Sequence, residues 1–121
     1  MLLLHKHRRS AFTLVEIMIV VLIIGLLAAL AIPNFRKSRS LAQKNGCIDN
    51  MRLIQGAVTE ALFAGKEPTA SDIYGPQGFL KSKPKCPANR GGPDYEIPTD
   101  DETAPTCPNV SDFPEHVLPP D

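Results

Sequence analysis

The chain has no tryptophan and few other aromatic residues, with five phenylalanines and two tyrosines among 121 residues. Aromatic side chains line most small-molecule pockets, so their scarcity argues against a deep ligand pocket. Positive charge is missing from the C-terminal part, because no lysine or arginine follows Arg90. The zero net charge of the whole chain therefore hides a polarised distribution. Eight acidic residues follow Arg90: Asp94, Glu96, Asp100, Asp101, Glu102, Asp112, Glu115 and Asp121.

The sequence also lacks the patterns that most enzymes and metal sites require. It contains no glycine-rich phosphate loop, no nucleophile elbow and no paired Ser/His/Asp arrangement, so we expect no catalytic residue. The cysteines form no CxxC pair, and no two histidines have the spacing of metal ligands. Cys86, Cys107 and His116 could in principle bind zinc, but without such a pair we predict no bound metal and no cofactor.

One apolar stretch dominates the N-terminal part of the chain. Residues 11–32 are apolar except for Thr13 and Glu16. A helix over these residues would extend about 33 Å, which is enough to cross a hydrocarbon core of about 30 Å. A basic leader, residues 1–11, precedes it and carries Lys6, Arg8 and Arg9. Positive charge before an apolar segment predicts a cytoplasmic leader and an exported C-terminal part.

Two interpretations of this segment compete. The run Ala29-Leu30-Ala31 has the small residues of a secretory cleavage site, which would release a soluble protein after Ala31. Glu16 argues against an ordinary signal, because a carboxylate deep in a membrane costs a few kcal/mol. In the first turn of a helix, however, the same carboxylate gains about 0.3–1 kcal/mol from the helix dipole.

The run Ala11-Phe12-Thr13-Leu14-Val15-Glu16 resembles the start of type IV pilin-like proteins, which include the pseudopilins of type II secretion systems. The resemblance implies that a prepilin peptidase cuts between Ala11 and Phe12 and N-methylates Phe12. It also implies that Glu16 pairs with the amino terminus of Phe12 on an adjacent subunit. Ala11 departs from the glycine that is usual before the cut.

Gly25 and Pro33 interrupt the apolar helix. Pro33 removes a backbone donor and predicts a kink or loosened turn, and the resemblance favours a hinge at these two residues. Close packing at Gly25 and a plain membrane exit at Pro33 are the alternatives. We assign residues 12–33 to a transmembrane and assembly helix.

Residues 34–65 predict a second, amphipathic helical segment. Its apolar positions recur at intervals of three, four and seven residues, which is the pattern of one helix face. Ala64-Gly65 predicts the end of the helix. The apolar positions, which we expect to pack on the C-terminal domain, are Leu41, Ile48, Met51, Ile54, Val58, Ala61 and Leu62.

Residues 66–121 predict a small C-terminal domain. A capping-box pattern from Thr69 to Asp72 indicates a short helix that starts near Ala70. Residues 95–98 and 103–107 flank a polar turn and predict a two-stranded hairpin. The predicted fold is therefore α+β, with a long N-terminal helix and a small domain that contains a short helix and a hairpin.

The positions of two of the three cysteines suggest a disulfide. Cys86 and Cys107 bracket the predicted hairpin, and small exported domains often need such a cross-link. We predict a Cys86–Cys107 disulfide as the leading pairing. Cys47, on the amphipathic helix, is interpreted as a small buried residue or as an alternative partner.

The predicted protein is a structural subunit of a type IV pilus-like filament, most similar to a type II secretion pseudopilin. Its expected partners are other pilin-like subunits, a prepilin peptidase and the bacterial inner membrane, but no nucleic acid. The resemblance leaves calcium open, because some pseudopilins bind it in an acidic C-terminal loop. The alternatives are a soluble binding protein cleaved after Ala31 and an anchored, single-pass domain that does not polymerise. Carboxylates available for calcium are Asp94, Asp100, Asp101, Glu102 and Asp112.

Overall fold

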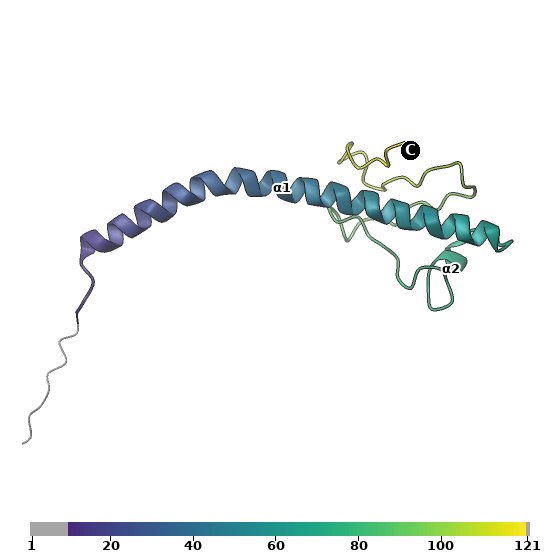
Figure 1. Ribbon diagram of the computed structural model, residues 1–121, viewed down its shortest axis with the longest axis horizontal. Coiled ribbons are helices and arrows are strands. Elements are labelled where there is room, and N and C mark those ends of the chain that lie inside the picture. Colours follow the sequence, from purple (N-terminus) through teal and green to yellow (C-terminus); the bar gives the residue numbers. More distant parts are fainter. Residues whose placement is uncertain (1–9, 121) are drawn as a thin grey trace, which may run out of the picture. The chain divides into compact units, whose positions relative to one another are not determined.

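A computed structural model describes residues 10–120 of the chain. Within that range the helices are α1, over Leu14–Phe63, and α2, over Ala70–Ile73 (Figure 1). The chain divides into two compact units, Met1–Lys37 and Ser38–Asp121, so α1 contributes to both. The predicted leader lies outside the described residues except for its last two positions. The predicted division into four segments stays a prediction.

Helix α1 ends where the sequence predicts it. Gly65 adopts a φ of 71°, a left-handed conformation that glycine tolerates better than other residues. Its N–H donates to the carbonyl of Leu62 at 3.0 Å, and the N–H of Lys66 donates to that of Ala61 at 3.0 Å. These two bonds form a Schellman motif, which satisfies carbonyl groups left without partners at the end of a helix.

The C-terminal part of α1 carries the core of the second unit. Its buried residues recur at helical spacing on one face: Cys47, Met51, Ile54, Ala57, Val58 and Ala61. The loops that follow α1 pack around this face (Figure 1). Ile48 and Leu62 are half-buried at its edge. The prediction is wrong for Leu41, whose side chain is exposed.

Helix α2 begins at Ala70, where the capping pattern predicts a short helix. Thr69 is the N-cap, and its hydroxyl oxygen accepts a hydrogen bond from the N–H of Asp72 at 3.4 Å. The Thr69 hydroxyl in turn donates to the Asp72 carboxylate. Ile73 and Tyr74 then enter the core, and the half-buried Phe79 and Leu80 pack against it.

The predicted hairpin is wrong. Residues 95–98 and 103–107 form no strand, and the described part of the chain holds only an isolated bridge between Tyr74 and Leu80. Pro98 and Pro105 explain the difference, because proline has no N–H to donate to a ladder. The fold of residues 10–120 is therefore a long helix, a one-turn helix and irregular loops, and not α+β.

Candidate functional site

The first turn of α1 brings Thr13 and Glu16 together. The backbone N–H of Thr13 donates to Glu16 Oε2 at 2.9 Å, and the N–H of Glu16 donates to Thr13 Oγ1 at 3.3 Å. This reciprocal pair is a capping box, which satisfies two N–H groups at the start of a helix. The T-x-x-E spacing was the sequence signal for it, and the interpretation of Glu16 as an assembly residue overlooked this local partner.

The capping box leaves Glu16 able to bind a second partner. Only Oε2 takes part in the bond to Thr13, and both residues are exposed. An ionised carboxylate accepts about four hydrogen bonds through its two oxygens. The intersubunit role predicted for Glu16 stays a prediction, and the local bond is compatible with it.

The predicted cleavage site precedes α1. Ala11 and Phe12 adopt no regular secondary structure, and the side chain of Phe12 is 83% exposed. An exposed segment outside a helix is the kind of backbone that a peptidase can bind. The cut between these residues and the methylation of Phe12 stay predictions.

The N-terminal part of α1 exposes an apolar surface. Every residue from 10 to 42 is exposed. The helix contains a segment long and apolar enough to cross a membrane. An apolar surface of this extent needs lipid or other protein to cover it.

Gly25 and Pro33, the predicted hinge residues, both lie inside α1. The helix continues through each of them without interruption. A Cβ atom added to Gly25 would meet nothing within 4 Å. These observations do not test a hinge, which stays a prediction.

A second group of residues lies in the core of the Ser38–Asp121 unit. It comprises the side chains of Cys47, Cys86, Cys107 and His116, all of them buried, which we call the thiol–histidine cluster. The sulfur atoms and one ring nitrogen lie within 4.8 Å of one another. Cys86 and Cys107, the predicted disulfide partners, lie close together in this cluster, with their Sγ atoms 3.7 Å apart. No disulfide joins them in this structure, where all three cysteines are free, and the pairing stays a prediction.

Two Cys-Pro turns position the later cysteines. The carbonyl of Cys86 accepts from the N–H of Asn89 at 3.1 Å, and that of Cys107 accepts from the N–H of Val110 at 3.1 Å. Each cysteine is thus the first residue of a tight turn. Asn89 Nδ2 donates to Asn109 Oδ1 at 3.2 Å, which links the two turns.

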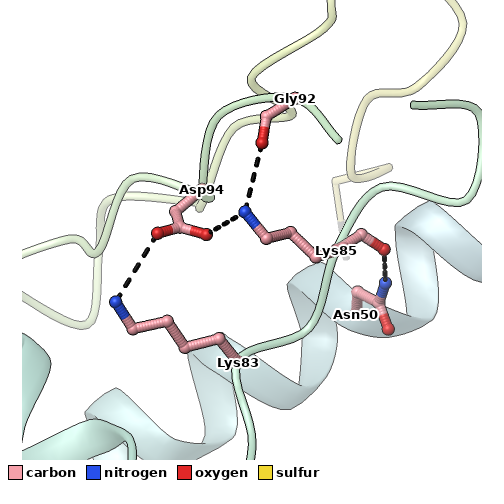
Figure 2. Close-up of polar contacts among 5 residues, drawn as sticks. All are labelled: Asn50, Lys83, Lys85, Gly92 and Asp94. Atoms are coloured by element: carbon pink, nitrogen blue, oxygen red, sulfur yellow. Dashed lines mark hydrogen bonds and ion pairs between the residues drawn. The ribbon is translucent and has the colours of Figure 1, made fainter. Parts of the chain in front are cut away.

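The Cys86 turn is fastened to α1 beside Cys47. Pro87 lies so close to Gly46 that a Cβ atom on this glycine would be 3.1 Å from the proline ring. Asn50 Nδ2 donates to the carbonyl of Lys85 at 2.9 Å (Figure 2). A glycine and an amide on one helix therefore hold the loop that presents Cys86.

An ion-pair group braces the same loop. Figure 2 shows the Asp94 carboxylate between two lysines, 2.6 Å from Lys85 Nζ and 3.5 Å from Lys83 Nζ. Lys85 Nζ also donates to the carbonyl of Gly92 at 3.1 Å. The hydrogen bond from Lys85 holds the pKa of Asp94 below its usual value.

Burial and hydrogen bonds act differently on the three thiols. Burial raises the pKa of Cys47 to about 12, although the Tyr95 hydroxyl, 3.2 Å from Cys47 Sγ, partly offsets this rise. Burial also raises the pKa of Cys107. At Cys86 burial is outweighed by hydrogen bonds, led by the N–H of Ala88, and the pKa is lowered. Cys86 is therefore the most acidic thiol of the cluster.

Comparison with known proteins shows which proteins the chain is similar to. A family model described as the prokaryotic N-terminal methylation motif matches residues 6–32. The competence protein ComGC of Bacillus subtilis is 37% identical over 80 residues, which are 64% of this chain and 81% of the relative. The ComG operon protein 3 homolog of Bacillus licheniformis is 33% identical over the same shares of both chains.

The chain belongs to the type IV pilin-like family. The type IV major alpha-pilin of Moraxella bovis is another relative, 41% identical over 66 residues, or 54% of this pilin-like chain and 42% of that pilin. No solved structure gives a significant match.

In this pilin-like protein, two of the acidic residues considered for calcium have local partners. Asp94 binds the two lysines, and Asp100 Oδ1 accepts from the N–H of Thr103 at 2.6 Å. Hydrogen bonds from the Thr103 side chain and from its backbone N–H lower the pKa of Asp100. Calcium binding stays a prediction.

Proposed function

We propose that this chain is a structural subunit of a type IV pilus-like filament and assembles through the N-terminal part of α1. A prepilin peptidase cuts between Ala11 and Phe12 and methylates the new amino terminus. One observation carries the proposal: an exposed apolar helix begins within the residues that match the methylation motif. Lipid covers this surface before assembly, and neighbouring subunits cover it afterwards.

Glu16 sets the register of assembly. In a surrounding of low dielectric constant, an unpaired carboxylate is costly, and a positive partner lowers that cost. The amino terminus of Phe12 on an adjacent subunit supplies this charge. Each added subunit therefore completes an ion pair with its neighbour, and a subunit in the wrong register leaves a charge unpaired.

Orientation follows from charge. The basic leader stays in the cytoplasm, α1 crosses the bacterial inner membrane, and the Ser38–Asp121 unit lies outside. Two alternatives predict other mature N-termini: cleavage after Ala31 would give Ile32, and an anchored domain without processing would retain Met1. Mass spectrometry of the protein from membranes distinguishes these three termini.

The system that the filament serves has two candidates. The small size of the exported domain favours a type II secretion pseudopilin. The Bacillus subtilis relative named as a competence protein favours a competence filament, because the match spans 81% of its length. Deletion of the gene in its native host separates the two: loss of exported proteins supports secretion, and loss of transformation supports competence.

The main test separates the charge of Glu16 from its capping role. Glu16→Gln keeps an oxygen that can accept from Thr13 but removes the charge. Thr13→Ala keeps the charge but removes the hydroxyl that caps the helix, at a cost of about 1 kcal/mol. We expect Glu16→Gln to be processed normally and to be lost from sheared filaments, whereas Thr13→Ala still assembles.

Both variants are scored for the mature N-terminus and for filament content in the same cells. Normal filaments from Glu16→Gln would contradict the register role. Loss of filaments from both variants, with normal processing, would assign Glu16 to the helix start alone.

A further inference from the structure

The thiol–histidine cluster has the composition of a metal site and not of an ordinary apolar core. Its donor atoms are the Sγ atoms of the three cysteines and Nδ1 of His116, and they lie within 4.8 Å of one another in the core of the Ser38–Asp121 unit. We propose that Cys47, Cys86, Cys107 and His116 bind one structural zinc ion. The sequence pattern argued against this site, and no relative's name suggests it.

The distances fit a tetrahedral ion. Zinc holds thiolate sulfur at about 2.3 Å and imidazole nitrogen at about 2.0–2.1 Å, so two sulfurs lie about 3.8 Å apart and a sulfur lies about 3.6 Å from a nitrogen. The Sγ atoms of Cys86 and Cys107 are 3.7 Å apart. His116 Nδ1 lies 3.6 Å from the first and 3.9 Å from the second. Cys47 Sγ lies within 4.8 Å of all three atoms, so a small inward shift of this side chain would complete a tetrahedron around the ion.

The surroundings suit metal-bound thiolates. Three thiolates and one Zn²⁺ carry a net negative charge, which needs hydrogen-bond donors when it is buried. The Cys86 turn directs backbone N–H groups at its sulfur, and the Cys107 turn does the same through Asn109. The Tyr95 hydroxyl donates to Cys47 Sγ at 3.2 Å. Thus every sulfur has at least one donor outside the cluster.

The ligands come from four separate places in the unit. Cys47 lies on α1, Cys86 and Cys107 begin the two Cys-Pro turns, and His116 lies in the C-terminal segment. Within residues 10–120 no strand ladder joins these segments. A small domain without such ladders often depends on a disulfide or a metal. An ion at the cluster would fasten three irregular segments to the helix.

The donor set identifies the class of metal. Thiolate and imidazole ligands favour zinc over calcium or magnesium, which prefer oxygen. Four buried protein ligands leave no open position for water or substrate, which is typical of structural and not of catalytic zinc. Because all four ligands belong to one chain, zinc binding at this cluster does not require polymerisation.

The first test measures metal in the full-length chain, extracted from membranes in detergent. Elemental analysis should find about one zinc per chain. After exchange with Co²⁺, the visible spectrum should show the intense bands of a tetrahedral cobalt–thiolate site. Absence of metal together with a mapped Cys86–Cys107 disulfide would overturn the proposal, as would cobalt spectra without thiolate bands.

Variants then assign the ligands. Cys47→Ser and His116→Gln should each lower the zinc content at least about tenfold. Neither residue is needed for a Cys86–Cys107 disulfide, so retained zinc in both variants contradicts the proposed ligand set. Because a variant that loses zinc can also unfold, the cobalt spectrum of the unchanged protein decides the matter independently.

A matched pair of tyrosine variants tests the hydrogen bond to Cys47. Tyr95→Phe and Tyr74→Phe each remove one hydroxyl from a buried ring, but only Tyr95 contacts a cysteine sulfur. Competition with a zinc chelator should show about 10–100-fold weaker binding for Tyr95→Phe. Tyr74→Phe should bind as the unchanged protein does. Equal affinities in the two variants would contradict the role of the hydroxyl.

Discussion

Helix α1 contributes to both units of the chain, and its side chains meet different surroundings in each. Up to Ala42 every described side chain is exposed, and most of them are apolar. From Cys47 to Ala61 the helix buries one face against loops of the same unit and exposes charged residues on the other. The backbone is the same helix throughout, so only the side chains set the two environments.

One helix can therefore serve both assembly and folding. A helix satisfies its own backbone hydrogen bonds, so it is stable in lipid without a partner from its own chain. The first part of α1 needs only an apolar environment, which a membrane or other copies can supply. The second part finds its environment within the chain, because the loops after α1 return to it. Assembly and folding are thus separated along a single element.

Truncation of a core residue should cause the largest loss of stability in the second unit. Ile54→Ala removes a fully buried side chain and should destabilise the Ser38–Asp121 unit by about 2–5 kcal/mol. Leu22→Ala removes an exposed side chain from the first part of α1 and should change the stability of the detergent-solubilised monomer by less than about 0.5 kcal/mol. Urea denaturation, followed by near-ultraviolet circular dichroism of the tyrosines, measures both.

In the filament, the relative effects of Ile54→Ala and Leu22→Ala should reverse. There we expect Leu22→Ala to loosen the packing of neighbouring subunits, while Ile54→Ala acts only through the fold of its own unit. Equal destabilisation of the monomer by the two variants would mean that the first part of α1 is not independent of the second unit.

Two glycines in and after α1 should give smaller effects on stability, of opposite sign. Gly65 has a φ of 71°, so Gly65→Ala should destabilise the end of α1 by about 1–2 kcal/mol. Gly56 lies inside the helix, where an added Cβ atom meets nothing within 4 Å, and Gly56→Ala should stabilise it by about 0.5–1 kcal/mol. Thermal denaturation in detergent should show melting temperatures that shift in opposite directions. Shifts of the same sign would contradict the assignment of one residue to the cap and the other to the helix interior.

The helices could be predicted from sequence because their signals are local. Gly65 ends α1 and Thr69 begins α2 through bonds to residues within four positions, which a short pattern captures. The hairpin was predicted from the polar turn between residues 95–98 and 103–107, and the missing N–H groups of Pro98 and Pro105 were given too little weight. The membrane-length segment of α1 followed from composition alone.

The thiol–histidine cluster could not be predicted in the same way. Its four ligands are spread from Cys47 to His116, and no two of them have the short spacing that marks most zinc sites. Only the folding of the loops onto α1 brings them together. One signal was present: Cys-Pro occurs twice, at Cys86 and Cys107, and both pairs form the same turn.

The smallest expected effect concerns the charges of the second unit. Within residues 10–37 the structure holds no ion pair, whereas Asp94 bridges Lys83 and Lys85 in the second unit. Because this contact lowers the pKa of Asp94 in the folded chain, the ionised form favours folding. The contribution is present above the usual pKa of 3.8 and is lost as the pH falls through the lower folded value.

Asp94→Asn should therefore be less stable than the unchanged chain at about pH 6, and the difference should shrink at about pH 3. Asp101→Asn, at an exposed carboxylate without an ion pair among the described residues, is the control and should show little change at either pH. Loss of zinc in acid affects all three proteins alike, so the differences between them isolate the ion pair. If the difference for Asp94→Asn stayed constant between the two pH values, the carboxylate would contribute by its hydrogen-bond geometry and not by its charge.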